Sequence, residues 1–170
     1  MTLPAVESLI EKLTQALNPF FENPESAPII VGIETGGAWI AEELRQQVAP
    51  DAEIGRLNIT FYRDDFTRNG LHPTIKPSSL PHDIDDKTII LVDDVLHSGR
   101  TIRAAMNELF DYGRPKRIIL VILIDRGERE IPIQADIVAE TMTLEANTHI
   151  KLEGPEPLSL IIKTLEPDAG

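Results

Sequence analysis

Two adjacent carboxylates and a turn containing glycine and hydroxyl groups stand out in the stretch "IILVDDVLHSGRTIRAA". Asp93 and Asp94 come directly after an apolar run, and Ser98, Gly99 and Thr101 precede an amphipathic run. Carboxylates accept hydrogen bonds from sugar hydroxyls, whereas a glycine turn at a helix start binds phosphate through outward-pointing N–H groups. The stretch therefore predicts a sugar-phosphate site. The alternative is that the carboxylates simply cap the turn.

A second turn of the same kind, "GIETGGAWIA", joins another apolar run to another helical pattern. Thr35, Gly36 and Gly37 can bind a second anion there, because a helix N-terminus carries about half a positive charge. Taken alone, however, two glycines in succession also suit an ordinary turn. The pattern therefore predicts an anion site only in combination with the acidic pair.

The polar stretch from 63 to 81 contains three prolines and has no hydrophobic period. A segment of this length without secondary structure is either a functional lid or a disordered insertion in a compact domain. Arg63, Arg68 and Lys76 would bring positive charge to such a lid. A passive loop is the alternative interpretation.

Apolar periodicity predicts the elements that position these turns. Helical spacing predicts helices over 3–17, 36–48 and 101–113, and apolar runs predict strands over 28–33, 54–62, 88–92 and 117–124. Shorter edge strands are predicted over 135–140, 148–152 and 158–163. Strands that alternate with amphipathic helices predict an α/β fold, a parallel sheet with helices on both faces. Ligands bind at the carboxyl ends of such strands, where four segments would meet: 34–37, 63–81, 93–101 and 125–132.

Composition sets further limits on the protein. The 170 residues suit one domain, 1–170, and the absence of cysteine excludes disulfides and thiolate metal sites. The N-terminus lacks the order of a signal peptide, and no apolar run approaches the ~18–20 residues that span a bilayer. No metal-ligand spacing is present, so no protein-bound metal is assigned. We therefore expect a cytoplasmic protein.

The formal net charge of -12 argues against broad nucleic-acid binding, which depends on basic surface. The charge is unevenly distributed, because residues 100–129 contain seven basic and four acidic side chains, a local charge of +3. A small anion would be attracted to this region. A solvated surface is the alternative for most of these side chains.

The stretch Val92–Thr101 resembles the 5-phosphoribosyl-1-diphosphate (PRPP) signature of type I phosphoribosyltransferases. That resemblance implies that Asp93 and Asp94 bind the ribose hydroxyls as catalytic residues. It also implies that the following residues bind the 5-phosphate: Val95, Leu96, His97, Ser98, Gly99, Arg100 and Thr101. Mg²⁺ is implied as an ion that PRPP carries, not as a resident of the protein.

Residues 28–140 also resemble the PyrR family, pyrimidine-operon regulators with uracil phosphoribosyltransferase activity, most specifically in "YRDD", "GRP" and "DRGEREIP". The resemblance implies that Thr35, Gly36 and Gly37 bind pyrophosphate, and that Arg63 is a catalytic residue on a loop that closes over the substrate. It implies a small hood near 125–135 and the C-terminal strands. Its candidates for the uracil base are Asp125, Arg126 and Arg129. Gly36 departs from the pattern, because the relatives carry an arginine there.

These features predict an enzyme that makes UMP and pyrophosphate from uracil and PRPP, with UMP-responsive regulation as a further possibility. One alternative is a regulator that binds leader mRNA with little catalysis. Another is transfer to a different base, since the PRPP signature does not select the acceptor. His97 is either a general base or a solvent-facing side chain. We further expect no membrane association and a homo-oligomer, a dimer or larger.

Overall fold

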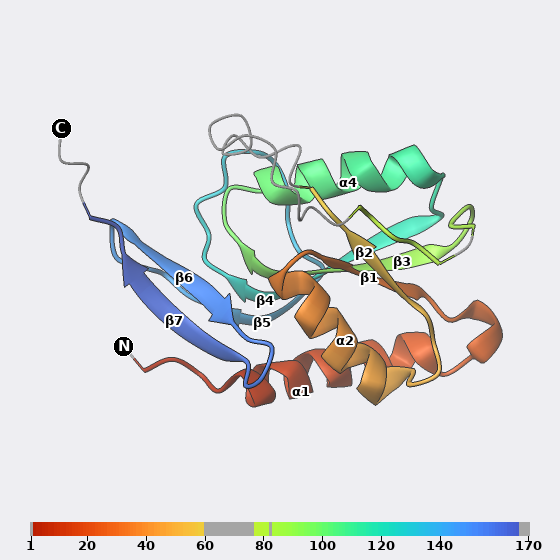
Figure 1. Ribbon diagram of the computed structural model, residues 1–170, viewed down its shortest axis with the longest axis horizontal. Coiled ribbons are helices and arrows are strands. Elements are labelled where there is room, and N and C mark those ends of the chain that lie inside the picture. Colours follow the sequence, from red (N-terminus) through yellow and green to blue (C-terminus); the bar gives the residue numbers. More distant parts are fainter. Residues whose placement is uncertain (1, 60–76, 82, 167–170) are drawn as a thin grey trace.

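A five-stranded parallel sheet lies at the centre of the computed structural model (Figure 1). The structure describes residues 2–59, 77–81 and 83–166. The strand order is β2-β1-β3-β4-β5, and each neighbouring pair runs parallel. The strands are β1 (Ile29–Ile33), β2 (Ile54–Leu57), β3 (Thr88–Leu96), β4 (Arg117–Asp125) and β5 (Ile137–Thr141). The predicted fold class is confirmed.

Helices cover both faces of this sheet, as Figure 1 shows. On one face lie α1 (Val6–Leu17) and α2 (Gly36–Val48), and on the other lies α4 (Arg100–Tyr112). Leucines at helical spacing turn α1 toward the sheet, and Leu9, Leu13 and Leu17 are fully buried. Two short 3-10 turns follow α1: η1 (Asn18–Phe21) and η2 (Pro24–Ser26).

The third strand is longer than the sequence predicted, and the difference concerns the acidic pair. The prediction ended the strand at Val92, whereas β3 continues through Asp93 and Asp94 to Leu96. The ladder with β4 causes the extension, because Asp93 is in register with Ile122 and Leu96 with Asp125. The carboxylates therefore stand on a rigid strand and not in the loop after it.

The second strand is shorter than predicted within the described residues. It ends at Leu57, and the predicted residues 60–62 lie outside the described residues. The amide of Asn58 donates to Ser78 Oγ (2.8 Å), so a side chain takes the place of a neighbouring strand. Arg56 and Ser79 form an antiparallel bridge at this edge.

The last two predicted strands form their own sheet. β6 (Thr148–Glu153) and β7 (Ser159–Thr164) pair as an antiparallel hairpin, so β5 alone of the three predicted edge strands borders the main sheet. Ile150, Leu152 and Leu160 bury their side chains in the same cluster as α1 and α2. Among the described residues, none of the helices has the length and apolarity needed to cross a membrane.

Candidate functional site

Three turns follow the carboxyl ends of neighbouring parallel strands. Residues 34–35 lead from β1 into α2, residues 97–99 lead from β3 into α4, and residues 126–131 follow β4. Because these strands are adjacent and parallel, their carboxyl ends lie at one edge of the sheet. Three of the four predicted segments thus meet there, and most of the fourth, residues 63–76 of 63–81, lies outside the described residues.

The acidic pair is held by its own backbone. Asp93 is 5% exposed, and its Oδ1 accepts a hydrogen bond from the amide of Asp94 (2.9 Å). Oδ1 of Asp94 in turn accepts one from the amide of Val95 (2.8 Å). These bonds fix the direction of both carboxylates before any ligand binds. Asp94 is half-buried, so the pair presents one deep and one shallower acid.

The glycines of the first turn pack against this acidic pair. A Cβ atom added at Gly37 would lie 2.5 Å from the carbonyl oxygen of Val92 and 3.0 Å from Cα of Asp93. A Cβ added at Gly36 would overlap the carboxylate of Asp94. Neither position has room for a side chain, because this turn packs directly against the end of β3. The carboxylate of Asp94 thus occupies the space that a side chain at residue 36 would need. With this packing, an arginine at position 36 would require Asp94 to move.

The turn at residues 97–99 begins α4 with a left-handed glycine. Gly99 has φ +94° and precedes the first helical residue, a conformation that glycine adopts without steric cost. Ser98 Oγ accepts from the amide of Arg100 (3.2 Å), so this hydroxyl is engaged in the turn. Leu96 is buried in the cluster beneath α4, and Val95 packs against the cluster on the other face of the sheet, so both side chains belong to the core.

Other predicted phosphate ligands are more exposed. Arg100 is paired with Glu130 (2.6 Å) at the surface, and Thr101 is half-buried in the first turn of α4. Thr35 precedes α2, is exposed, and makes no capping bond with its side chain. Arg63, Arg68 and Lys76 lie outside the described residues.

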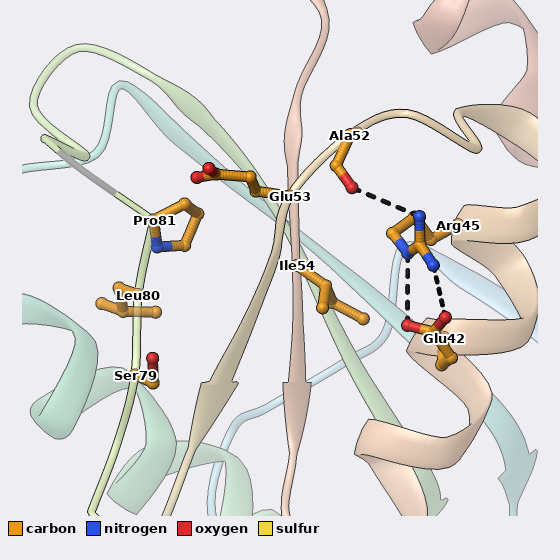
Figure 2. A pocket seen from close by; sticks show the side chains of 8 residues that line it. All are labelled: Glu42, Arg45, Ala52, Glu53, Ile54, Ser79, Leu80 and Pro81. Carbon is orange, nitrogen blue, oxygen red and sulfur yellow. Dashed lines mark hydrogen bonds and ion pairs between the residues drawn. The ribbon is translucent and has the colours of Figure 1, made fainter.

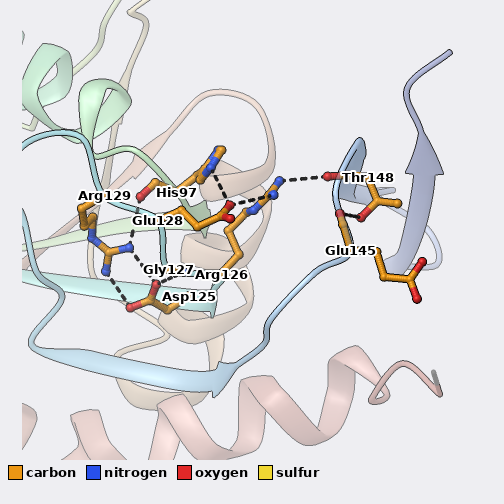
Figure 3. Close-up of polar contacts among 8 residues, drawn as sticks. All are labelled: His97, Asp125, Arg126, Gly127, Glu128, Arg129, Glu145 and Thr148. Carbon is orange, nitrogen blue, oxygen red and sulfur yellow. Dashed lines mark hydrogen bonds and ion pairs between the residues drawn. The ribbon is translucent and has the colours of Figure 1, made fainter. Parts of the chain in front are cut away.

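The segment after β4 is held together by charged side chains (Figure 3). Arg129 binds both carboxylate oxygens of Asp125, at 2.8 and 2.7 Å, and this guanidinium holds the pKa of the Asp125 carboxyl below its ordinary value. Arg126 donates to the carbonyl of Thr148 (3.2 Å) in β6. Its buried Nε has no hydrogen-bond partner within the described residues. Whether these three residues bind a base stays a prediction.

Glu128 is a site-edge residue that the sequence interpretation missed. Its Oε2 lies 3.3 Å from Nε2 of His97 and 3.3 Å from Nη2 of Arg126, so it bridges two predicted site residues. His97 is 47% exposed in its side chain. The alternation of charges in "DRGERE" was the available signal, because such alternation favours local ion pairs.

Two cavities among the described residues differ in their distance from the acidic pair. One of about 530 Å³ lies between the end of α2 and the start of β2, where Arg45 pairs with Glu42 (Figure 2). It is remote from the acidic pair along both elements. A second, of about 380 Å³, is lined by Glu34 and Thr35 together with Arg56 of β2. Sequence reasoning gave Arg56 no role, and no motif marks it.

A parallel α/β sheet with an acidic strand end between two anion-type turns is the architecture of the phosphoribosyltransferase class. The phosphoribosyl transferase domain model matches residues 2–154. Among solved structures, a hypoxanthine-guanine phosphoribosyltransferase from Bacillus anthracis aligns with TM-score 0.65 at 23% identity, covering 84% of this chain and 83% of that one. A purine phosphoribosyltransferase from Pyrococcus horikoshii aligns with TM-score 0.61 at 21% identity, covering 81% and 83%. These likenesses concern the fold.

Curated relatives specify the family further. Bifunctional protein PyrR of Pseudomonas paraeruginosa is 49% identical over 168 residues, 98% of this chain and 99% of the relative. Bifunctional protein PyrR of Nitrosococcus oceani is 47% identical over 165 residues, 95% and 93% of the two chains. The chain belongs to the PyrR family of phosphoribosyltransferases, and the predicted resemblance is confirmed.

Proposed function

We propose that this protein transfers the phosphoribosyl group of PRPP to uracil, forming UMP and pyrophosphate. Membership in the PyrR family supports this reaction. The observation that carries the proposal is the contact between the first turn and the end of β3, with Gly37 against Asp93 and Gly36 against Asp94. It brings a candidate ribose site and a candidate pyrophosphate site side by side. A substrate that joins ribose directly to pyrophosphate requires this arrangement.

In the proposed reaction, a ring nitrogen of uracil bonds to C1 of the ribose as the bond from C1 to pyrophosphate breaks. The nitrogen releases its proton to water, and the pyrophosphate oxygen keeps the bonding electron pair. Positive charge develops on the sugar, and the fixed carboxylates of Asp93 and Asp94 stabilise it while they hold the hydroxyls. The N-termini of α2 and α4 hold the two phosphate-bearing ends.

Mg²⁺ fits this site as an ion carried by the substrate. It prefers carboxylate, phosphate and water oxygens and keeps several of its waters. Asp93 and Asp94 provide adjacent carboxylates beside the candidate pyrophosphate turn, so they would face the ion or the hydroxyls that it touches. When bound, the ion neutralises charge on the leaving pyrophosphate.

The segment after β4 is the proposed cover for the pyrimidine. Arg126 is its best-supported contact, because its buried Nε lacks a partner within the described residues and its amide binds the carbonyl of Leu96 (3.0 Å). Arg63, which lies outside the described residues, is proposed to stabilise the departing pyrophosphate. Closure of a loop over the site would exclude water that otherwise attacks C1.

The test is synthesis of UMP from labelled uracil and PRPP with Mg²⁺, with hypoxanthine and orotate as alternative acceptors. We expect UMP with uracil and little product from the other two bases. No UMP at saturating substrates would contradict the proposal. Product from hypoxanthine or orotate in place of uracil would support the alternative of a different acceptor.

A regulatory activity is the second candidate, because the relatives are named bifunctional and residues 100–129 carry a local excess of basic side chains. Three of these cations are engaged in ion pairs: Arg100, Arg126 and Arg129. A gel shift with the pyrimidine leader RNA of the source organism, with and without UMP, tests it. UMP-dependent binding with a steep salt dependence would support regulation. Equally weak binding to the leader RNA and to an unrelated RNA would contradict regulation.

A further inference from the structure

Arg129 is surrounded by acceptors from its own chain (Figure 3). Its Nη1 and Nη2 donate to the two carboxylate oxygens of Asp125, and Nη1 also donates to the carbonyl of His97 (3.1 Å). Its Nε donates to the carbonyl of Ile133 (2.7 Å). Each nitrogen of the guanidinium is therefore engaged, and the side chain is only 22% exposed. Such an arginine has little capacity left for a base.

The carbonyl of His97 belongs to a run in which the backbone oxygens are bound in turn. Leu96 O accepts from the amide of Arg126 (3.0 Å), and Ser98 O accepts from the amides of Glu130 (3.0 Å) and Ile131 (3.2 Å). A turn that binds an anion must present N–H groups to it and direct its carbonyl oxygens elsewhere, because the oxygens repel negative charge. The segment after β4 supplies the hydrogen-bond donors for these carbonyl oxygens.

Within this run the acceptor at His97 differs from its neighbours. Backbone amides bind Leu96 O and Ser98 O, and any residue except proline supplies such a donor. The carbonyl of His97 instead accepts its hydrogen bond from a side chain, that of Arg129. The direction of this peptide group therefore depends on the identity of one residue, which Asp125 orients through two hydrogen bonds.

We propose that Arg129 is a positioning residue for the turn at residues 97–99, the candidate 5-phosphate turn. Its side chain holds the His97 carbonyl away from the phosphate and so keeps this turn in its anion-binding form. The inference rests on the proposed function of that turn, and it gives Arg129 a role other than contact with the base. Lysine would keep the charge at this position but lose the planar fork that reaches Asp125 and two carbonyls together.

Arg45 provides a matched control, because it lies near the C-terminal end of α2, away from the turn that begins this helix (Figure 2). It binds both carboxylate oxygens of Glu42 and also donates to the carbonyls of Pro50 and Ala52. Its side chain is 19% exposed, close to the 22% of Arg129. The two arginines thus make the same kinds of bond, but Arg45 lies in the last turn of the helix that Gly36 begins.

The experiment measures binding of ribose 5-phosphate by titration calorimetry, because this ligand has a phosphate but no base. Arg129→Lys should weaken its binding about tenfold, the size expected when a hydrogen bond from a charged donor is lost. Arg45→Lys should change it by less than about twofold, as expected for a site far from the ligand. The KM for uracil at saturating PRPP should stay near that of the unaltered protein in both variants.

Circular dichroism establishes that each variant is folded. Asp125→Asn is a second, milder perturbation, and it should also weaken the binding of ribose 5-phosphate. Unchanged binding by folded Arg129→Lys or Asp125→Asn would overturn the inference. An equal loss in Arg45→Lys would also overturn it. If the unaltered chain binds ribose 5-phosphate but makes no UMP, the uracil assignment fails while the role of Arg129 stands. If it makes UMP but binds no ribose 5-phosphate, the role of Arg129 fails while the uracil assignment stands.

Discussion

At the scale of single residues, the paired glycines of the first turn have different physical reasons for being bare. Gly37 faces backbone, the carbonyl of Val92, which cannot move without disturbing β3. Gly36 faces the end of a side chain, the carboxylate of Asp94, which can rotate away. Gly36 therefore protects the position of a candidate catalytic acid, and Gly37 protects the packing of helix against strand.

Substitution of the two glycines should separate these roles. Gly36→Ala should raise the KM for PRPP about tenfold, because Asp94 must leave its position, while the free energy of unfolding changes by about 1 kcal/mol or less. Gly37→Ala should lower the free energy of unfolding by about 1–3 kcal/mol through overpacking. Urea titrations and PRPP kinetics check the pair. The same loss of stability in both variants would contradict this distinction.

The ion pair of Asp125 should also leave a signature in acid. Arg129 lowers the pKa of Asp125 in the folded protein, whereas the unfolded value stays at about 3.9. The folded state thus binds fewer protons, so this contribution to stability is present above about pH 4 and is lost as the pH falls through the folded-state pKa. In Asp125→Asn, urea unfolding between pH 7 and pH 3 should depend less on pH. Parallel curves for the two proteins would contradict this.

At the scale of elements, α4 connects the 5-phosphate turn to the hydrophobic core. Its first residue follows Gly99, and its inner face buries Ile102, Ala105 and Leu109 against one face of the sheet. Its outer face leaves Phe110 54% exposed. The helix N-terminus that faces the candidate ligand is therefore held in place by apolar packing one to three turns away.

Neighbouring substitutions in α4 should have very different effects. Leu109→Ala removes a fully buried side chain and should cost about 2–5 kcal/mol of unfolding free energy. Phe110→Ala removes an exposed one and should stay within about 0.5 kcal/mol. Urea denaturation monitored by circular dichroism compares them. A large loss in Phe110→Ala would instead indicate that another surface covers this residue.

At the scale of the whole molecule, the charge is acidic while the site must attract anions. The net charge is -12, and the cations of residues 100–129 that form ion pairs do so with acidic neighbours: Glu128, Glu130 and Asp125. In the proposed function, attraction of PRPP would therefore depend on helix N-termini and directed amides, which act at short range. Long-range attraction of a polyanion is correspondingly weak.

A heparin column provides a direct check of this balance. At about 0.15 M salt, where charges are screened beyond about 8 Å, the protein should pass through without retention. An anion exchanger should retain it under the same conditions, as expected for a sequence pI of about 4.7. Retention on heparin would show that basic side chains form a concentrated surface that the net charge conceals.

Most of the fold follows from patterns in the sequence. The predicted helix over 36–48 coincides with α2, and the predicted helix over 101–113 differs from α4 by one residue at each end. Strand lengths were less predictable, because they depend on the neighbouring strand. Nothing local in "VDDVL" indicates that β4 extends far enough to pair with Asp93 and Leu96. The pairing of β6 with β7 in a separate hairpin was likewise unpredictable, because it depends on which strand each one contacts.

Residue types along the chain already define the chemistry available at the site: two adjacent carboxylates, two glycine turns at helix starts and a charged segment after the fourth strand. Residue types and their spacing are local properties, and they carry the resemblance to the PyrR family. Which of these groups are in contact follows from the folded arrangement. It placed Gly36 against Asp94 and Arg129 against the carbonyl of His97, residues separated by 58 and 32 positions in the chain. Contacts over such separations arise from strand order and register, which no local pattern encodes.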